Sequence, residues 1–450
     1  MKTHKVRRGY NLPIVGAPTE ETADAPRPSI FAVRPTEFRA LKPRLHVKVG
    51  DTVKIGTTLF VDKAHPEIRF SSPAAGRIQD IQYGHRRAIE RISIQSSSDD
   101  FEQFENFRPG EISKVSRERL VEHLLAGGVW PFLRRRPFDT VARPDDQPTS
   151  IFVNCMDSAP LAANPEFALK GKFAEFEAGI EAMRVLCPSV HVVVSGAVQK
   201  SIFSDAKGVE LHRFTGRHPA GLVSTHIERI DPITAPTRCV WYINARDLVQ
   251  IGSYLLVGQY PTERLVALAG PGVKHRRYLH ARAGASIESL VGADLEAGEQ
   301  RIISGNVLTG KKVQKDDSLG FYDDLVTVIP EGREQHFIGW MLPGFFRPTW
   351  SRAFASALLP IKQFSMHTNR NGEGRALVKT GDYRRVISLD VLPEQLVKAI
   401  LAEDIELMEQ LGILECAPED FALCSYICPS KTEFTEIIQK GLDMMRAELT

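Results

Sequence analysis

The stretch FVDKAHPEIRFSSPAAGRI, residues 60–78, decides how the N-terminal part of the chain folds. Two short apolar runs lie on either side of a polar segment that contains Lys63, and the turn SSPAAG follows. Many short strands separated by Gly, Pro or polar turns are typical of a small β-barrel. Strand candidates of this kind occur at 45–49, 53–55, 59–61, 68–70, 78–81 and 89–94.

The segment Asp62-Lys63-Ala64 resembles the residues around the modified lysine of lipoyl and biotinyl domains. Modifying ligases read the lysine at the tip of a hairpin, and in lipoyl domains the turn proline lies closer to that lysine. Here Pro73 follows Lys63 by ten residues, so we expect His65 and Pro66 at the tip and Lys63 on its flank. We therefore predict a carrier-like barrel with Lys63 unmodified; a true carrier would show a mass increase on Lys63.

The bulk composition indicates a multidomain globular protein. A chain of 450 residues, with 43% hydrophobic and 25% charged residues, holds two to four domains. The 57 basic and 55 acidic residues are too evenly balanced for nucleic-acid binding. Six unevenly spaced cysteines suit a reducing cytoplasm rather than a disulfide framework. Neither a secretory signal nor the roughly 20 apolar residues of a membrane-spanning helix is visible.

Beyond the barrel the pattern changes to alternating strands and helices. Strand candidates at 149–157, 190–196 and 239–244 alternate with helical patterns at 172–186 and 245–256, which predicts a Rossmann-like parallel sheet. Residues 264–332 mix strands with a short helix, and helical patterns at 392–412 and 431–449 dominate the end. The fold is predicted to be multidomain α/β and α+β, with a linker at 96–100. The expected domains are 1–100, 101–260, 261–335 and 336–450.

Two candidate cofactor motifs are incomplete. Cys424 and Cys428, before a proline, match the end of the bacterial run C-x₂-C-x₂-C-x₃-C-P, but Pro418 and Phe421 stand where two further cysteines belong. We interpret the two thiols as buried and as an iron–sulfur remnant that holds no metal, since zinc also prefers four ligands. The glycine pair at 127–128 precedes bulky residues and a proline, which suits a helix C-cap better than a phosphate cradle. Thirteen scattered histidines show no local motif, so no catalytic or cofactor-binding residue is assigned.

The segment WPFLRRRPF, residues 130–138, interleaves aromatic and basic side chains. One interpretation is a solvated loop with one or two rings in the core. The other is a contact surface for a membrane partner or a quinone headgroup, because arginine and aromatic residues are enriched in interfaces. The candidate contact residues are Trp130, Phe132, Arg134, Arg135, Arg136 and Phe138.

Taken in order, these stretches resemble the NqrA family of the Na⁺-translocating NADH:quinone reductase over nearly the whole chain. The resemblance is more distant to the flavin- and NADH-binding subunit of respiratory complex I and to the related subunit of Rnf-type complexes. It is carried by GYNLPIVGAP (9–18), LHVKVGDTV (45–53), FSSPAAGRI (70–78), RRRPF (134–138), MDSAPLAANPEFALKGKFAEFEAGIEAM (156–183), GLVSTHIERIDPI (221–233), ERLVALAGP (263–271), ISGNVLTG (303–310), FIGWMLPG (337–344), VISLDVLP (386–393) and EDFALCSYICPSK (419–431).

The resemblance implies a β-grasp (SLBB-like) domain at 261–335 and a helical domain with a degenerate iron–sulfur motif at 336–450. It implies a peripheral subunit on the cytoplasmic face of the bacterial inner membrane that itself binds no cofactor. Its partners would be the other five subunits, chiefly the membrane-embedded NqrB. The complex uses NADH, FAD, FMN, riboflavin, iron–sulfur centres and ubiquinone, and electron transfer to quinone drives Na⁺ export. Whether ubiquinone contacts this chain directly stays open.

Three other functions remain as alternatives. A divergent flavin- and NADH-binding dehydrogenase subunit would be yellow when purified, and a lipoyl- or biotin-type carrier would be modified on Lys63. A cytosolic scaffold without a membrane partner would stay in the supernatant on fractionation. The missing glycines and cysteines argue against the first, and the lengthened hairpin argues against the second.

Overall fold

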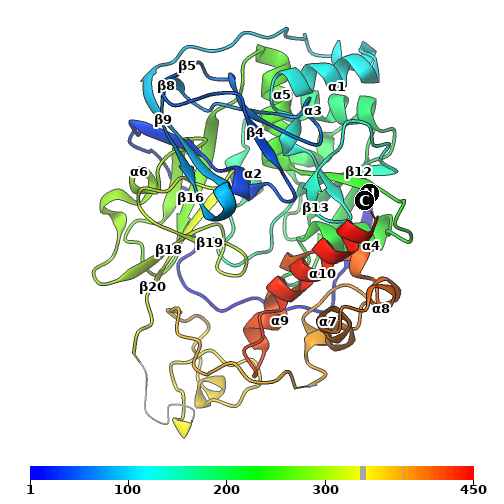
Figure 1. The fold of residues 1–450 in the computed structure, drawn as a ribbon. Coiled ribbons are helices and arrows are strands. Elements are labelled where there is room, and N and C mark those ends of the chain that lie inside the picture. Colours follow the sequence, from blue (N-terminus) through cyan, green and yellow to red (C-terminus); the bar gives the residue numbers. More distant parts are fainter. Residues whose placement is uncertain (335–340, 379, 450) are drawn as a thin grey trace.

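The computed structural model describes residues 1–334, 341–378 and 380–449 (Figure 1). It confirms the predicted multidomain α/β and α+β fold. A barrel of two small sheets, a seven-stranded sheet and a six-stranded sheet are followed by a group of C-terminal helices. The expected boundary at 335/336 and the first four residues of FIGWMLPG lie outside the described residues. Among the residues that are described, no helix is long and apolar enough to cross a bilayer.

The barrel is formed by two facing sheets. One contains β3 (Ile30–Val33), β9 (Ile89–Ser98), β8 (Ala75–Tyr83) and β5 (Thr52–Val53), and the other contains β4 (Pro43–Leu45), β6 (Thr58–Asp62) and β7 (Arg69–Ser71). Phe60 and Phe70 stack at 4.6 Å between ring centroids inside it. The linker predicted at 96–100 is wrong in its first part, because β9 continues to Ser98 and pairs there with Ala75.

The seven-stranded sheet lies at the centre of the molecule. Its order is β1 (Lys2–Lys5), β14 (Glu210–Thr215), β13 (Val190–Ser195), β12 (Ser150–Cys155), β15 (Val240–Asn244), β10 (Arg134–Arg136) and β11 (Thr140–Val141). The first five strands are parallel, and β10 and β11 add an antiparallel edge. The N-terminal residues therefore do not belong to the barrel alone, since β1 joins this sheet and β2 (Thr22–Asp24) joins the six-stranded one.

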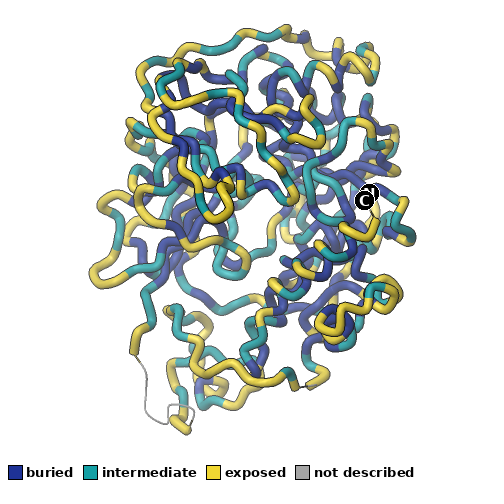
Figure 2. The backbone as a smooth tube through the Cα atoms, viewed as in Figure 1, coloured by how far each residue is buried: buried dark blue, intermediate teal, exposed yellow. Residues whose placement is uncertain are grey.

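Both faces of the seven-stranded sheet are covered, which explains why its central strands read as continuous apolar runs. Ile151 and Val153 of β12 pack in one core with α1 (Arg117–Ala126), α3 (Phe173–Leu186) and α5 (Ala245–Val257). Phe152, which points to the opposite face, packs in a second core with α4 (Val223–Ile230) and the C-terminal helices. Figure 2 shows that the buried residues are concentrated in the interior, where the sheets and helices pack.

The six-stranded sheet follows the α/β domain in sequence. Its order is β19 (Lys311–Val313), β18 (Gln300–Ser304), β20 (Leu325–Pro330), β16 (Glu263–Ala269), β17 (Arg277–Arg282) and β2. The short helix α6 (Ile287–Val291) packs on it through Ile287 and Leu290, as the predicted β-grasp fold requires. The strand β16 pairs in parallel with β20 and antiparallel with β17.

The C-terminal domain contains α7 (Pro393–Leu401), α8 (Ile405–Gln410), α9 (Ala422–Ile427) and α10 (Phe434–Leu449). The single helix predicted over 392–412 is wrong, because it is two helices broken at 402–404. Glu403 adopts a left-handed φ of 58°, and the carboxylate of Asp404 caps the new helix by accepting from the Leu407 N–H at 3.0 Å. An aspartate offers this local bond, so it favours a new N-terminus over a continued helix.

Candidate functional site

A cleft of about 1240 Å³ lies at the carboxyl edge of the seven-stranded sheet. After β12 the chain passes through α3 to β13, which lies on one side of β12 in the sheet. The later strand β15 lies on the other side of β12, so the strand order reverses between β12 and β15. In open α/β sheets the crevice outside such a switch point is the usual ligand site. Asn154 and Asn244, at the ends of β12 and β15, line the cleft. Asp323 and Asp324 of the β-grasp domain also line it.

Three helices begin at the cleft. Lys172, Val223 and Ala245 mark the starts of α3, α4 and α5, and all three residues line the cavity. None of these helices has a side-chain cap hydrogen bond at its N-terminus. Uncapped N–H groups carry partial positive charge, so the helix ends favour an anionic group in the cleft.

Acidic side chains oppose that preference. Asp157 follows β12 and is exposed within the cleft, where desolvation by the surrounding walls raises its pKa to about 7 although the Ala159 N–H donates to its carboxylate at 2.7 Å. Burial also raises the pKa of Asp324, although the guanidinium of Arg246 lies 3.5 Å from its carboxylate. Near neutral pH Asp157 therefore exchanges between a neutral proton donor and a carboxylate acceptor.

The loops at the cleft are fixed to one another by hydrogen bonds. The side chain of Asn154 donates to the Gly221 carbonyl at 3.0 Å and accepts from the Met156 N–H at 3.2 Å. The Gly221 N–H donates to the Ser158 hydroxyl at 2.8 Å, and that hydroxyl lies 3.1 Å from Nδ1 of His218. The cleft wall is thus preformed. Sequence reasoning missed this site because its residues come from loops with no common motif.

The glycine pair at 127–128 forms a helix C-cap, as predicted. The N–H groups of Gly127, Gly128 and Val129 donate to carbonyls at the end of α1, at 3.1, 3.1 and 3.2 Å. Gly128 has a φ of 69°, and a Cβ there would lie 2.0 Å from the Ser71 hydroxyl on the barrel. These N–H groups are used inside the chain and are not directed at a phosphate.

The aromatic residues of the 130–138 segment lie in the interior. The Trp130 indole donates to the Ala142 carbonyl at 2.7 Å and its ring meets Trp241 edge-on at 5.5 Å. Phe132 stacks on Phe321 of the β-grasp domain at 5.0 Å. Both rings are fully buried, Trp130 within the α/β domain and Phe132 between this domain and the β-grasp domain, so neither is exposed to a partner. Phe138 is half-buried against the second core.

The three arginines of the segment have separate roles. Arg134 lies 4.6 Å over each of the rings of Tyr242 and Tyr322 and lines the cleft. Arg135 pairs with Asp146 at 2.6 Å. Arg136, only 1% exposed, donates to the Glu419 carboxylate at 3.0 Å. The sequence predicts that Arg134, Arg135 and Arg136 contact lipid or a partner. In the structure their side chains point mostly inward, because they pair with acidic side chains of the same chain.

Asp139 is the centre of this charge network. Arg39, Arg134 and Arg136 approach its carboxylate at 3.0, 3.7 and 3.8 Å, and the Tyr242 hydroxyl donates to it. Burial acts to raise the pKa of Asp139, but the arginines outweigh burial and hold the pKa well below its usual range. Asp139 is therefore ionised at any working pH.

Cys424 and Cys428 are buried beside Tyr383. The Cys424 thiol lies 3.9 Å from the Tyr383 carbonyl, and the Tyr383 hydroxyl lies 3.1 Å from the Cys428 sulfur. Burial raises the pKa of Cys424; it also acts to raise the pKa of Cys428, but hydrogen bonds from Tyr383 and Thr432 lower it. Phe421, where relatives would carry a cysteine, is fully buried in the same core. Within the described residues, the cysteines belong to no group of three close metal ligands.

Lys63 follows the last residue of β6 and is exposed. Its N–H donates to the Lys42 carbonyl at 2.8 Å, while the turn of the hairpin falls at Pro66 and Glu67. The structure places Lys63 on the flank of the hairpin, as expected from its distance to Pro73. That Lys63 carries no cofactor stays a prediction.

Three domain families match successive parts of the chain. They are the NqrA N-terminal barrel-sandwich hybrid domain at 4–97, the NqrA second alpha/beta domain at 115–260 and the NQRA C-terminal domain at 265–315. The NqrA protein of the Na⁺-translocating NADH-quinone reductase from Saccharophagus degradans is 38% identical over 445 residues, covering 99% of both chains. The chain belongs to the NqrA family. The corresponding proteins of Hahella chejuensis and Serratia proteamaculans are each 37% identical and cover 99% of this chain.

Likeness to solved structures is weak. An NAD⁺-reducing [NiFe]-hydrogenase in the air-oxidised state aligns with 50% of this chain and 47% of its own, at a TM-score of 0.34 and 13% identity. A likeness of this size supports no conclusion about the site. Membership of the NqrA family rests on the full-length relatives.

Proposed function

We propose that this chain is the peripheral NqrA component of a Na⁺-translocating NADH:ubiquinone oxidoreductase on the cytoplasmic face of the membrane. The observation that supports this is the match, end to end, with relatives that carry the name of that component. In this proposal the other five subunits hold NADH, the flavins FAD, FMN and riboflavin, and the iron–sulfur centres. The chain contributes to assembly and to the quinone-reduction end of the complex, while electron transfer to ubiquinone drives Na⁺ export.

The contact with the membrane-embedded NqrB is assigned to the segment 341–359, the docking segment. Its exposed large apolar side chains are Met341, Leu342, Phe345, Phe346, Leu358 and Leu359. Phe346 and Leu358 are 81% and 88% exposed, although such residues are normally buried. A concentration of exposed apolar residues marks an interaction site. Figure 1 shows this part of the chain at the lower edge of the molecule, beyond the sheets.

The charge of the docking segment and its surroundings suits a membrane protein. Residues 341–372 contain four basic residues and no acidic one. Basic residues at the cytoplasmic side are attracted by anionic lipid headgroups, and aromatic rings favour the same depth. The segment therefore fits a partner whose surface lies at the boundary between membrane and water.

The docking segment is held in a defined shape. The buried Ser356 donates to the Arg347 carbonyl at 2.5 Å, and the Ala355 N–H donates to the Pro343 carbonyl at 2.8 Å. Trp350 meets Tyr10 edge-on at 5.0 Å between centroids. A surface that is already ordered loses less entropy on binding.

Replacing Phe346 and Leu358 together by aspartate is expected to weaken association with NqrB by at least about 100-fold, since exposed anchors of an interface contribute roughly 2 kcal/mol each. The measurement is co-purification of partner subunits with the tagged chain from membranes, together with NADH:quinone activity of the recovered complex. The variant chain should be folded and appear in the supernatant. Stability should be unchanged because both side chains are already exposed.

Tyr83→Asp is the matched control, because Tyr83 is an exposed aromatic residue on the barrel. It should leave the complex intact. Normal assembly and activity of the double variant would exclude the docking segment as the contact. Binding of the isolated chain to anionic lipid vesicles, lost in the double variant, would show that the segment contacts lipid and not NqrB.

A second candidate function, nucleotide or flavin binding, is favoured by the cleft at the switch point. The starts of α3, α4 and α5 favour an anion there, and Asp157 becomes increasingly charged as the pH rises through about 7. NADH or FMN should therefore bind roughly fivefold more weakly at pH 8 than at pH 6, which corresponds to about 1 kcal/mol of repulsion. Asp157→Asn should remove this pH dependence.

Titration of the purified full chain with NADH and with FMN, followed by fluorescence, tests the second candidate. Asp80→Asn, on the exposed surface of the barrel, is the control and should retain the wild-type pH dependence. Absence of saturable binding at both pH values would leave the cleft without this role.

A further inference from the structure

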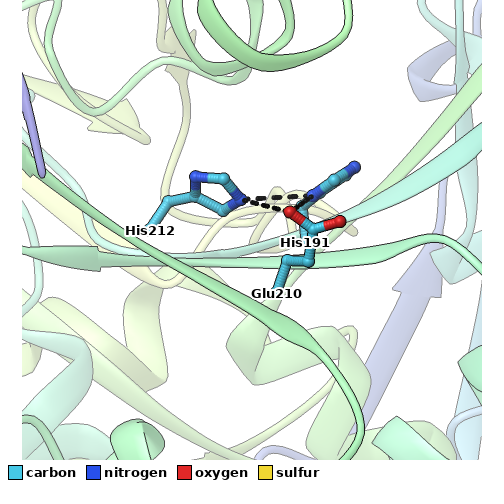
Figure 3. Close-up of side chains that lie close together, drawn as sticks. All are labelled: His191, Glu210 and His212. Atoms are coloured by element: carbon cyan, nitrogen blue, oxygen red, sulfur yellow. Dashed lines mark hydrogen bonds and ion pairs between the residues drawn. The ribbon is translucent and has the colours of Figure 1, made fainter. Parts of the chain in front are cut away.

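Two histidines and a glutamate come together on the face of the seven-stranded sheet that carries the C-terminal domain. His191 lies in β13, and Glu210 and His212 lie in β14 (Figure 3). Nδ1 of His191 is 3.2 Å from Nε2 of His212. The Glu210 carboxylate oxygen lies 4.0 Å from the first nitrogen and 3.9 Å from the second. This triad is the one group of three close metal-ligand atoms found among the described residues.

The strand register produces this arrangement. Because β13 and β14 are parallel, His191 pairs with Glu210 and Val193 pairs with His212. Side chains two residues apart in a strand point to the same face, so Glu210 and His212 both lie beside His191. The sequence predicts no metal site here, because the two histidines are about twenty residues apart and form no local motif.

The remaining nitrogen of each histidine ring is already held by a neighbour. Nε2 of His191 lies 3.2 Å from the Ser189 hydroxyl, and Nδ1 of His212 lies 3.2 Å from Nε2 of His4 in β1. Metal-bound histidines usually donate this second N–H to a polar group, which fixes the ring and its tautomer. The two nitrogens that face each other are therefore the ones free to bind a shared ion.

The spacing suits a tetrahedral ion. Two ligand nitrogens at the usual 2.0–2.1 Å from zinc are about 3.3 Å apart, close to the separation of the two histidine nitrogens. The Glu210 side chain is 58% exposed and can move the roughly 0.6 Å by which its oxygen must approach the two nitrogens. Lys2 lies 3.6 Å from the same carboxylate, but it is more exposed still and is displaced easily.

The protonation states also suit a ligand set. Burial lowers the pKa of His191, and burial together with the neighbouring His191 and His4 lowers the pKa of His212 to about 4. Both rings are thus neutral at pH 7, as metal ligands must be. Without metal, the N–H of one ring donates a hydrogen bond to the facing nitrogen of the other. On binding, that proton moves to the far nitrogen of its own ring, and no proton is released.

We propose that Nδ1 of His191, Nε2 of His212 and the Glu210 carboxylate bind one divalent transition-metal ion of the Zn²⁺ class, with water in the fourth position. Imidazole suits zinc, copper and nickel, and zinc also binds carboxylate oxygen. The ion joins β13 to β14 and, through His4, fixes the N-terminal edge strand β1. The site is independent of the proposed role in quinone reduction, so either proposal can fail alone.

The test uses the full chain purified without a histidine tag, stripped of metal with a chelator and supplied with ZnCl₂. After gel filtration, metal analysis should find one zinc ion per chain, and titration calorimetry should give the affinity. His212→Gln should abolish binding, and Glu210→Gln should weaken it at least about tenfold. His4→Gln should weaken it by about 10- to 100-fold, the usual effect of losing a group that positions a ligand.

Glu210→Gln keeps the test decisive if the buried histidine variant fails to fold, because Glu210 is largely exposed. The matched control is His275→Gln, which alters an exposed histidine that pairs with Asp294 at 2.7 Å. This control should bind zinc as the wild type does. The proposal is overturned if the wild type retains no zinc, or if zinc survives Glu210→Gln and His212→Gln at unchanged affinity.

Discussion

Replacing Arg136 by methionine is expected to lower the free energy of unfolding by about 3 kcal/mol, the lower end of the range for breaking a buried ion pair. Arg136 is 1% exposed and interacts with Asp139 of the α/β domain and Glu419 of the C-terminal domain. Methionine keeps much of the side-chain volume, so the loss of stability is caused by the missing charge and not by a cavity. Asp139 retains Arg39 and Arg134, which limits the cost.

Urea denaturation at pH 7 measures this change, and Arg69→Met is the control. Arg69 lies in β7 and is exposed, so its replacement should change stability by no more than about 0.5 kcal/mol. The double variant Arg136→Met with Glu419→Gln should recover part of the loss, because it removes the carboxylate left without its partner. If Arg136→Met is as stable as the wild type, the network does not join the two domains.

The arginine segment shows where reasoning from sequence fails. Arginine is almost never fully buried unless it is paired, so a run of three predicts a surface. The pairing that reverses this prediction comes from distant parts of the chain: Arg39 and Glu419 lie about one hundred and nearly three hundred residues away. No pattern within 130–138 contains that information. The interpretation as a solvated loop with one or two rings in the core is correct for the rings of Trp130 and Phe132, but the arginines form strand β10 and not a solvated loop.

Local patterns predict the structure more successfully. The bounds of β12, β13 and α3 are predicted to within two residues, and burial on two faces explains the continuous apolar runs of the two strands. The glycine cap after α1 also follows from local chemistry. By contrast, the cleft and the His191–Glu210–His212 triad depend on strand order and register. Strand β14 itself is missed, since LHRF alternates polar and apolar residues beside a buried histidine.

Replacing Gly252 by alanine is expected to lower the free energy of unfolding by about 2 kcal/mol, against the sign that helix propensity predicts. Alanine is better than glycine inside a helix by about 1 kcal/mol. However, a Cβ on Gly252 of α5 would lie 1.7 Å from the Glu175 carbonyl oxygen in α3. Gly179 of α3 makes the reciprocal approach, where a Cβ would lie 2.7 Å from the Leu248 carbonyl oxygen.

A backbone carbonyl cannot turn aside as a side chain can, so α3 and α5 would have to separate along their shared face. Overpacking of this kind typically costs about 1–3 kcal/mol, and this clash falls at the upper end, which outweighs the gain in propensity. Thermal and urea unfolding measure the net effect. Gly374→Ala, where nothing lies within 4 Å of the added Cβ, is the control and should be neutral. Stabilisation by Gly252→Ala would mean that the two helices do not pack through their glycines, and that propensity alone decides the outcome.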